Sequence, residues 1–130
     1  MSFVRSRLAR RTLTILFASA FGVLAVATPA HATPPNHFGA MAISFSTGSV
    51  GSAVNYYTTH EAQLAAMARC GVADCQWVVT MDRNCGSVAQ QPLTDHWGWA
   101  YGPDRNRARV SARNAAGWFA YDVLSACTAR

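Results

Sequence analysis

The chain carries four cysteines, at positions 70, 75, 85 and 127, all in its C-terminal half. In an oxidising compartment, an even number of cysteines in a short chain forms disulfides that limit the possible folds. In a reducing compartment the same residues more often bind a metal or take part in catalysis. The effect of these cysteines on the fold therefore depends on the compartment of the protein. The N-terminal sequence indicates that compartment.

The N-terminus has the three parts of a cleavable signal peptide in the right order. Its basic residues are Arg5, Arg7, Arg10 and Arg11. An apolar run of about fifteen residues, 13–27, precedes a small-x-small cleavage site at Ala30–Ala32, and it is shorter than the roughly twenty residues of a membrane span. We predict a signal peptide over residues 1–32 for the general secretory route. A twin-arginine signal and a retained N-terminal anchor are the alternatives.

Removal of this segment changes the charge balance. The whole chain has eleven basic residues, all arginine, against six acidic ones. Four of the arginines lie in the predicted signal peptide, so seven arginines face six acidic residues in the mature chain. The net charge of +5 therefore belongs mainly to the leader. It gives no support to nucleic-acid binding, and we expect no nucleic-acid partner and no transmembrane segment after cleavage.

The mature chain, about 98 residues, is long enough for one domain, and its hydrophobic core gains from covalent links. We predict a lead-in over residues 33–38 and a single exported domain over residues 39–130. Two disulfides are the favoured state of the cysteines. A zinc site is the alternative, but the cysteine spacing does not match the usual paired-ligand patterns.

The sequence pattern predicts two units with the same order of elements. The first has strands at 39–45 and 49–57, a helix that begins at the capping box Thr58–Glu61 and ends at Cys70, and a strand at 76–81. We expect Leu64, Met67 and Ala68 on one face of this helix. The second has strands at 85–90 and 96–101, a helix from Asp104 to about residue 116, and a strand at 118–126. The fold class is therefore α+β, with two strand-strand-helix-strand units packed as one small domain.

An internal repeat supports the two-unit interpretation, with units at 39–82 and 86–127. A shift of 47 residues without gaps brings seven identical residues together. The pairs are Gly39/Gly86, Ala42/Ala89, Thr47/Thr94, Gly51/Gly98, Ala53/Ala100, Ala65/Ala112 and Ala68/Ala115. Since glycine and alanine are common here, the shared order of elements is the stronger argument.

Several motifs together resemble the family known as domain of unknown function 4189. They are Gly39-Ala-Met-Ala, the turn Ser46-Thr-Gly, Glu61-Ala, Cys70-Gly-Val-Ala-Asp-Cys, Asn84-Cys-Gly and Trp97-Gly-Trp. The resemblance covers about residues 38–127. It implies a small secreted, disulfide-bearing protein of a kind frequent in actinobacteria, and it implies no activity and no catalytic residue.

Three disulfide pairings are possible. We favour Cys70–Cys75 at the end of the first helix and Cys85–Cys127 between the first and last strands of the second unit. In the chain-entropy model the second bond, which closes the longer loop, stabilises by about 4 kcal/mol and the first by roughly 2. A bond between Cys75 and Cys85 is the main rival.

Trp97, Trp99 and Tyr101 alternate along one predicted strand and therefore share a face. The opposite face carries His96, Gly98 and Ala100, which suits close packing of the helix that contains Ala108, Ala112 and Ala115. The aromatic row is either core or an exposed surface for cell-wall glycan or a protein partner. Burial in the core is the favoured alternative.

Arg105, Arg109 and Arg113 recur every four residues and form a stripe on the second predicted helix. Such a stripe can bind phosphate, anionic lipid or an acidic glycan. A solvated face with no ligand is the favoured alternative.

Little in the sequence suggests catalysis. The mature histidines His37, His60 and His96 are scattered, and Asp95 and His96, as neighbours on a strand, point to opposite faces. No nucleophile elbow, phosphate loop or zinc-protease motif is present. We expect no catalytic residue, no metal and no cofactor. The favoured function is a secreted, non-enzymatic interaction domain at the cell envelope or outside the cell. A small envelope-directed hydrolase, or an inhibitor of one, is the alternative.

Overall fold

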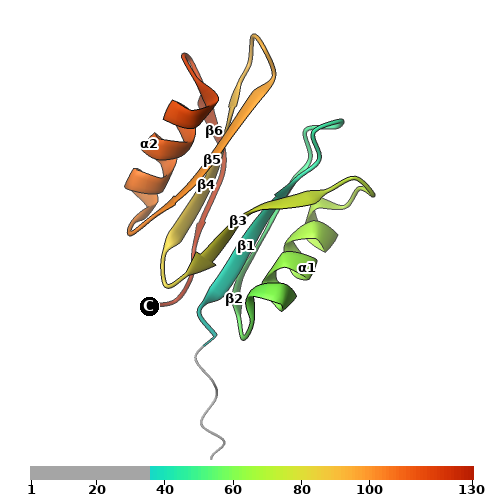
Figure 1. Cartoon of the computed structure of the whole chain (residues 1–130), viewed down its shortest axis with the longest axis vertical. Coiled ribbons are helices and arrows are strands. Elements are labelled where there is room, and N and C mark those ends of the chain that lie inside the picture. Colours follow the sequence, from blue (N-terminus) through green and yellow to red (C-terminus); the bar gives the residue numbers. More distant parts are fainter. Residues whose placement is uncertain (1–35) are drawn as a thin grey trace, which may run out of the picture. The chain divides into compact units, whose positions relative to one another are not determined.

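The computed structural model describes residues 36–130 (Figure 1). The predicted signal peptide and residues 33–35 of the predicted lead-in lie outside this range. The elements are β1 (Phe38–Ile43), β2 (Val50–Tyr56), α1 (Thr59–Cys70), β3 (Gln76–Asp82), β4 (Cys85–Gln91), β5 (His96–Gly102), α2 (Arg105–Ala116) and β6 (Tyr121–Cys127). All predicted helices and strands are present, and neither of these helices is long and apolar enough to cross a membrane.

The last strand begins three residues later than predicted. Gly117 and Phe119 have φ angles of 108° and 60°, so the chain turns here instead of extending. The Ala120 amide closes the turn by donating to the Gly117 carbonyl at 3.2 Å. As a result Trp118 and Phe119 lie on a turn, with exposed fractions of 86% and 79%.

The eight elements form two three-stranded antiparallel sheets, each with one helix. The strand orders are β2-β1-β3 and β5-β4-β6, so the first strand of each unit is central and the helix connects the two outer strands. This confirms the predicted α+β fold with two strand-strand-helix-strand units.

The two units also share their strand register. Met41 pairs with Val79 in the first sheet, and Val88 pairs with Leu124 in the second. Directly after these pairs, both sheets contain a register shift of the kind that a β-bulge produces. The repeat therefore extends to an irregularity that the sequence comparison did not reveal.

The offset between the units is not constant, which corrects the gap-free alignment. In the strands, Gly51 corresponds to Gly98, 47 residues later. In the helices, the backbone of Ala66 and Cys70 lies against Gly51, and that of Ala112 and Ala116 lies against Gly98, so the helix offset is 46. The predicted residue pairs Ala65/Ala112 and Ala68/Ala115 are therefore wrong by one residue.

Each helix packs on its sheet through small residues. The buried positions are Ala62, Ala66 and Cys70 in α1, and Ala108, Ala112 and Ala116 in α2. A Cβ atom at Gly51 or Gly98 would overlap with the helix backbone, and this closeness leaves no room for larger side chains. The predicted apolar face of α1 is therefore wrong, since Leu64 is 50% exposed. In α2 the third buried alanine is Ala116, whereas the sequence predicted Ala115.

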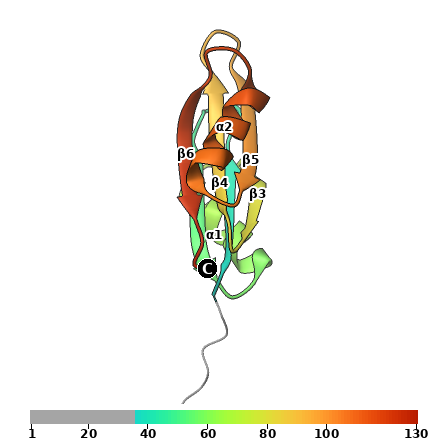
Figure 2. The same cartoon turned by 90° about the vertical axis from the view of Figure 1, so that its left-hand side faces the viewer.

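The faces of the sheets that point away from the helices pack on one another. The core between the sheets contains Met41, Ile43, Val79, Met81, Val88 and Trp97. Gly86 leaves space there for Met41, Val79 and Met81. The described elements thus form four layers, helix-sheet-sheet-helix (Figure 1), with α2 across the β5-β4-β6 sheet in Figure 2.

Both predicted disulfides are confirmed. Cys70–Cys75 joins the end of α1 to the segment before β3, with an S–S distance of 2.02 Å. Cys85–Cys127 joins residues that are direct partners in the β4–β6 ladder, with an S–S distance of 2.03 Å. All four cysteine sulfurs are therefore paired within residues 36–130, and the zinc alternative is wrong.

Candidate functional site

The predicted aromatic row divides between core and surface. Trp97 is 8% exposed and belongs to the core between the sheets, whereas Trp99 is 41% and Tyr101 68% exposed. On the opposite face of β5, Gly98 contacts the backbone of α2, as predicted. Neither sequence alternative describes the whole row, because one end of the strand lies inside the sandwich and the rest lines an open hollow.

This hollow, of about 410 Å³, lies between β3 and β5. We call it the aromatic groove. Its lining residues are Trp77, Val78, Val79, Thr80, Trp99, Ala100 and Tyr101. Since β3 and β5 are edge strands of different sheets, the groove runs along the junction of two sheet edges. Among the described residues, none with a charged side chain lines it.

Trp77 was not among the predicted site residues. Its side chain is 48% exposed on β3, and the sequence pattern predicted only that it lies in a strand over residues 76–81. A tryptophan that keeps half its surface exposed in a small domain marks a candidate contact residue. With Trp99 and Tyr101 it gives the groove aromatic rings from both edges.

A fourth aromatic ring lies beside the groove. Phe45 is 46% exposed, and its ring centroid lies 6.1 Å from that of Trp99 and 6.5 Å from that of Trp97. These separations are typical of favourable aromatic pairs. Phe45 therefore extends the exposed aromatic surface from Trp99 onto the β1–β2 turn.

Hydrogen bonds to Asp74 hold the turn that carries Phe45. The hydroxyl of Ser46 donates to one oxygen of Asp74 at 2.6 Å, and that of Ser44 donates to the other at 2.7 Å. These bonds, with that of Ser46 contributing most, lower the pKa of Asp74 below its ordinary value because they favour the ionised carboxylate. Asp74 thus fixes the residues on both sides of Phe45.

The family described as Domain of unknown function (DUF4189) matches residues 38–128. The chain belongs to this family. The family resemblance seen in the sequence is thereby confirmed, and none of the curated proteins matches the sequence.

One solved structure has a similar fold to this DUF4189 domain. The NMR structure of Rv1813c from Mycobacterium tuberculosis aligns over 97% of this chain and 99% of that one, with a TM-score of 0.55 and 24% sequence identity. At this level of identity the likeness concerns the fold alone.

The arginine stripe of the DUF4189 domain has an internal partner. Arg109 and Arg113 both contact Oδ2 of Asp122 on β6, at 2.7 and 3.3 Å, and the Asp122 side chain is only 15% exposed. Arg105 lies further along the same helix and is exposed. Two of the three predicted anion-binding arginines therefore hold α2 against β6, a role that the sequence did not indicate.

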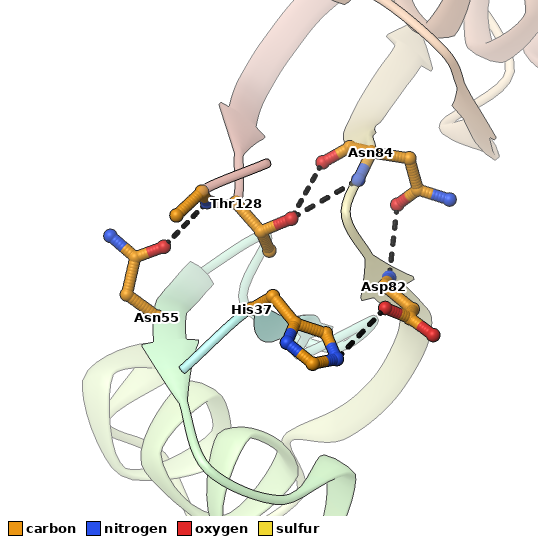
Figure 3. A network of polar contacts seen from close by, with 6 residues as sticks. His37, Asn55, Asp82, Asn84 and Thr128 are labelled. Carbon is orange, nitrogen blue, oxygen red and sulfur yellow. Dashed lines mark hydrogen bonds and ion pairs between the residues drawn. The ribbon is translucent and has the colours of Figure 1, made fainter. Parts of the chain in front are cut away.

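The three histidines of the predicted mature chain, His37, His60 and His96, lie outside the groove lining. His60 and His96 are exposed, and the carboxylate of Asp95 accepts a hydrogen bond from the Gln90 amide at 3.3 Å. Nε2 of His37 lies 3.2 Å from Oδ1 of Asp82 (Figure 3). This pair lies where the first unit meets the second.

Figure 3 shows that this junction is a polar network. The Asn84 amide donates to the Thr128 hydroxyl at 3.1 Å, and the Thr128 amide donates to the Asn84 carbonyl at 3.0 Å. The Ala129 amide donates to the Asn55 side chain at 2.7 Å. These bonds attach the C-terminal segment to both units, which is a structural role.

Proposed function

We propose that this DUF4189 domain is an exported, non-enzymatic binding protein that acts at the cell envelope or outside the cell. Its binding surface is the aromatic groove. The observation that carries the proposal is the set of exposed rings, Trp77, Trp99 and Tyr101, on both sides of one hollow. Burial of such rings dominates the energetics of many interfaces.

The size of the exposed ring surface limits the affinity that the rings can supply. From their exposed fractions, the three rings offer roughly 350 Å² of accessible surface. At about 25 cal/mol per Å², complete burial gives about 9 kcal/mol before the cost of association, which is itself about 4 kcal/mol or more. Ring burial alone therefore supports weak binding, and a tight ligand needs further contacts.

The groove lining supports a binding role over catalysis. Hydrolysis usually needs a general acid and base, or a nucleophile with its base, at hydrogen-bonding distance from the substrate. The polar side-chain groups of the lining are the hydroxyls of Thr80 and Tyr101 and the indole N–H groups. The alternative of an envelope-directed hydrolase would need its catalytic groups outside the groove lining.

Export is supported by the N-terminal pattern and by the two disulfides. Disulfides form and persist outside the cytosol, and all four cysteines of the domain are used in them. The test is expression of the full chain in a secreting host, followed by N-terminal sequencing of the released protein. We expect it to begin at Thr33, and a protein that keeps residues 1–32 refutes this part of the proposal.

A polypeptide is the preferred ligand, and a neutral cell-wall glycan is the second candidate. The uncharged lining and the exposed rings favour both, because sugar rings also stack on aromatic side chains. The exported protein is titrated with soluble envelope glycan and with envelope protein extract, and tryptophan fluorescence reports binding. We expect Trp99→Ala and Tyr101→Ala to weaken binding about tenfold or more.

The matched control is Trp118→Ala, which removes an even more exposed tryptophan that lies outside the groove lining. We expect this variant to bind like the wild type. Equal weakening by Trp118→Ala and Trp99→Ala, or no effect of either groove variant on any ligand, refutes the aromatic groove as the binding surface.

A further inference from the structure

The four edge strands of the two sheets differ in their regularity. The pairings of β2, β3 and β6 with their central strands each contain a register shift. β5 pairs with β4 through seven consecutive residue pairs, from Gln91↔His96 to Cys85↔Gly102, with no shift. Among the described strands, β5 is thus the one edge with an uninterrupted ladder.

The other edges also carry protective features. On β2, Asn55 has a φ angle of 64°, and the Arg69 guanidinium donates to the Ser52 carbonyl at 2.7 Å. β6 carries Asp122 with its two arginine partners, and β3 ends at Asp82. Bulges and charges of this kind keep an edge from pairing with another chain.

β5 has neither kind of protection. Its sequence from Trp97 to Gly102 contains no charged residue and no proline. A long, regular and uncharged edge exposes main-chain N–H and C=O groups that can pair with another strand. Figure 2 places β5 at one border of its sheet and β6 at the other.

The aromatic groove lies next to this edge. A strand added to a sheet lies about 4.8 Å from its neighbour and directs every second side chain to the same face. Along β5, the groove is lined by Trp99 and Tyr101, which share one face, and by Ala100 between them. An added strand would therefore place alternate side chains near these rings and near Trp77 on β3.

We infer that the ligand of the aromatic groove is an extended polypeptide segment of a partner protein, which adds to β5 as a fourth strand. This inference rests on the proposed function. Main-chain hydrogen bonds to β5 supply the contacts that ring burial alone lacks, and the rings select the side chains. Because the groove lining is uncharged, the segment has apolar side chains at alternate positions and no charge among them.

The probe is a synthetic heptapeptide selected on the exported protein from a library that is randomised at alternate positions. Each backbone nitrogen of this peptide is then methylated in turn. In an added strand, only every second N–H group faces β5, so methylation should weaken binding about tenfold at alternate positions and little at the others. Hydrogen exchange should slow at amides of β5 and not at those of β2.

Four outcomes overturn the inference. The first is that no selected peptide binds in a manner that depends on Trp99, and the second is an N-methylation profile in which the loss of binding does not alternate along the peptide. The third is unchanged hydrogen exchange at the β5 amides, and the fourth is a dimer that forms through β5 and blocks peptide binding. If envelope glycan still binds in a manner that depends on Trp99 and Tyr101, the proposed function stands and only the peptide ligand is refuted. If no ligand depends on the groove residues, both fail.

The variant Tyr101→Ala checks that side chains contribute as well. Tyr101 is 68% exposed, so its truncation should leave the fold intact. We expect it to weaken the peptide without changing the alternation in the N-methylation profile. Loss of the alternation in this variant contradicts a ladder formed by the main chain.

Discussion

Replacement of Gly98 by alanine should destabilise the domain more than the addition of one methyl group at any other position of β5. A Cβ atom at Gly98 would lie 2.7 Å from the carbonyl carbon of Ala115 and closer still to the backbone of Ala112 and Ala116. Ordinary contact begins at about 3.4 Å, so α2 must move away from the sheet by about 0.7 Å or more. Such a shift loosens the packing of Ala89, which is fully buried beneath the helix.

Overpacking of this kind costs about 1–3 kcal/mol, and the helix backbone gives way less easily than a side chain. In a domain of this size, that loss lowers the melting temperature by roughly 5–20 °C. Thermal and urea unfolding of the exported protein measure it. The control is Gly102→Ala, where the nearest atoms lie 3.0–3.4 Å away and the cost should be clearly smaller.

Equal stability of the two variants, or a loss below about 0.5 kcal/mol for Gly98→Ala, refutes the close approach of α2. The repeat offers a second check. Because Gly51 has the same relation to α1, Gly51→Ala should be destabilising to a similar degree. A large effect at one glycine and none at the other contradicts the equivalence of the two units.

Three other perturbations have defined outcomes. Replacement of both Cys85 and Cys127 by serine should cost about 4 kcal/mol of unfolding free energy in urea, since the bond closes a loop with a sequence separation of 42; a loss under about 1 kcal/mol contradicts the chain-entropy estimate. Asp122→Asn should destabilise the docking of α2 by about 1 kcal/mol, a modest value because both arginine partners are partly exposed; an unchanged melting temperature refutes this role. Because the pKa of Asp74 is lowered, its carboxylate stabilises the β1–β2 turn fully at pH values above the ordinary pKa of 3.8. This stabilisation is lost as the pH falls through the lowered pKa of the folded state. The amide chemical shifts of residues 44–49 should titrate in that acidic range, and Asp74→Asn should abolish the titration.

Much of the fold could be predicted because local signals agree with the tertiary structure. The hydroxyl of Thr58 accepts from the Glu61 amide at 3.1 Å, as the capping box predicts, and Gly71 ends α1 with a φ angle of 83°. The two disulfides could be inferred once the strands had been placed. In each case the deciding contact is close in sequence or follows from the order of the elements.

The buried face of α1 could not be predicted from hydrophobicity. The pattern favoured Leu64, the largest apolar residue of the helix, yet the buried residues include Ala62 and Ala66. What decides the face is the close approach of the helix to Gly51, which selects small side chains. That distance is a property of the packed layers and not of the helix alone.

The candidate site was found only in part for a similar reason. Alternation along β5 correctly grouped Trp99 and Tyr101, but the favoured alternative, burial of the whole row in the core, holds for Trp97 alone. Trp77 stands 22 residues before Trp99 in the chain, and only the packing of the two sheets brings β3 beside β5. The groove is therefore a property of the sheet–sheet junction, which no single strand pattern reveals.

The duplicated architecture also bears on the stoichiometry of binding. The register places Asp122, Ser52 and Val54 in the positions that correspond to Trp77, Trp99 and Tyr101, on the opposite edges β6 and β2. The β3–β5 side of the domain thus carries aromatic residues where the β2–β6 side carries polar and aliphatic ones. Under the proposed function, the domain over residues 36–130 therefore offers one aromatic groove, and we predict that each domain binds one ligand at a time.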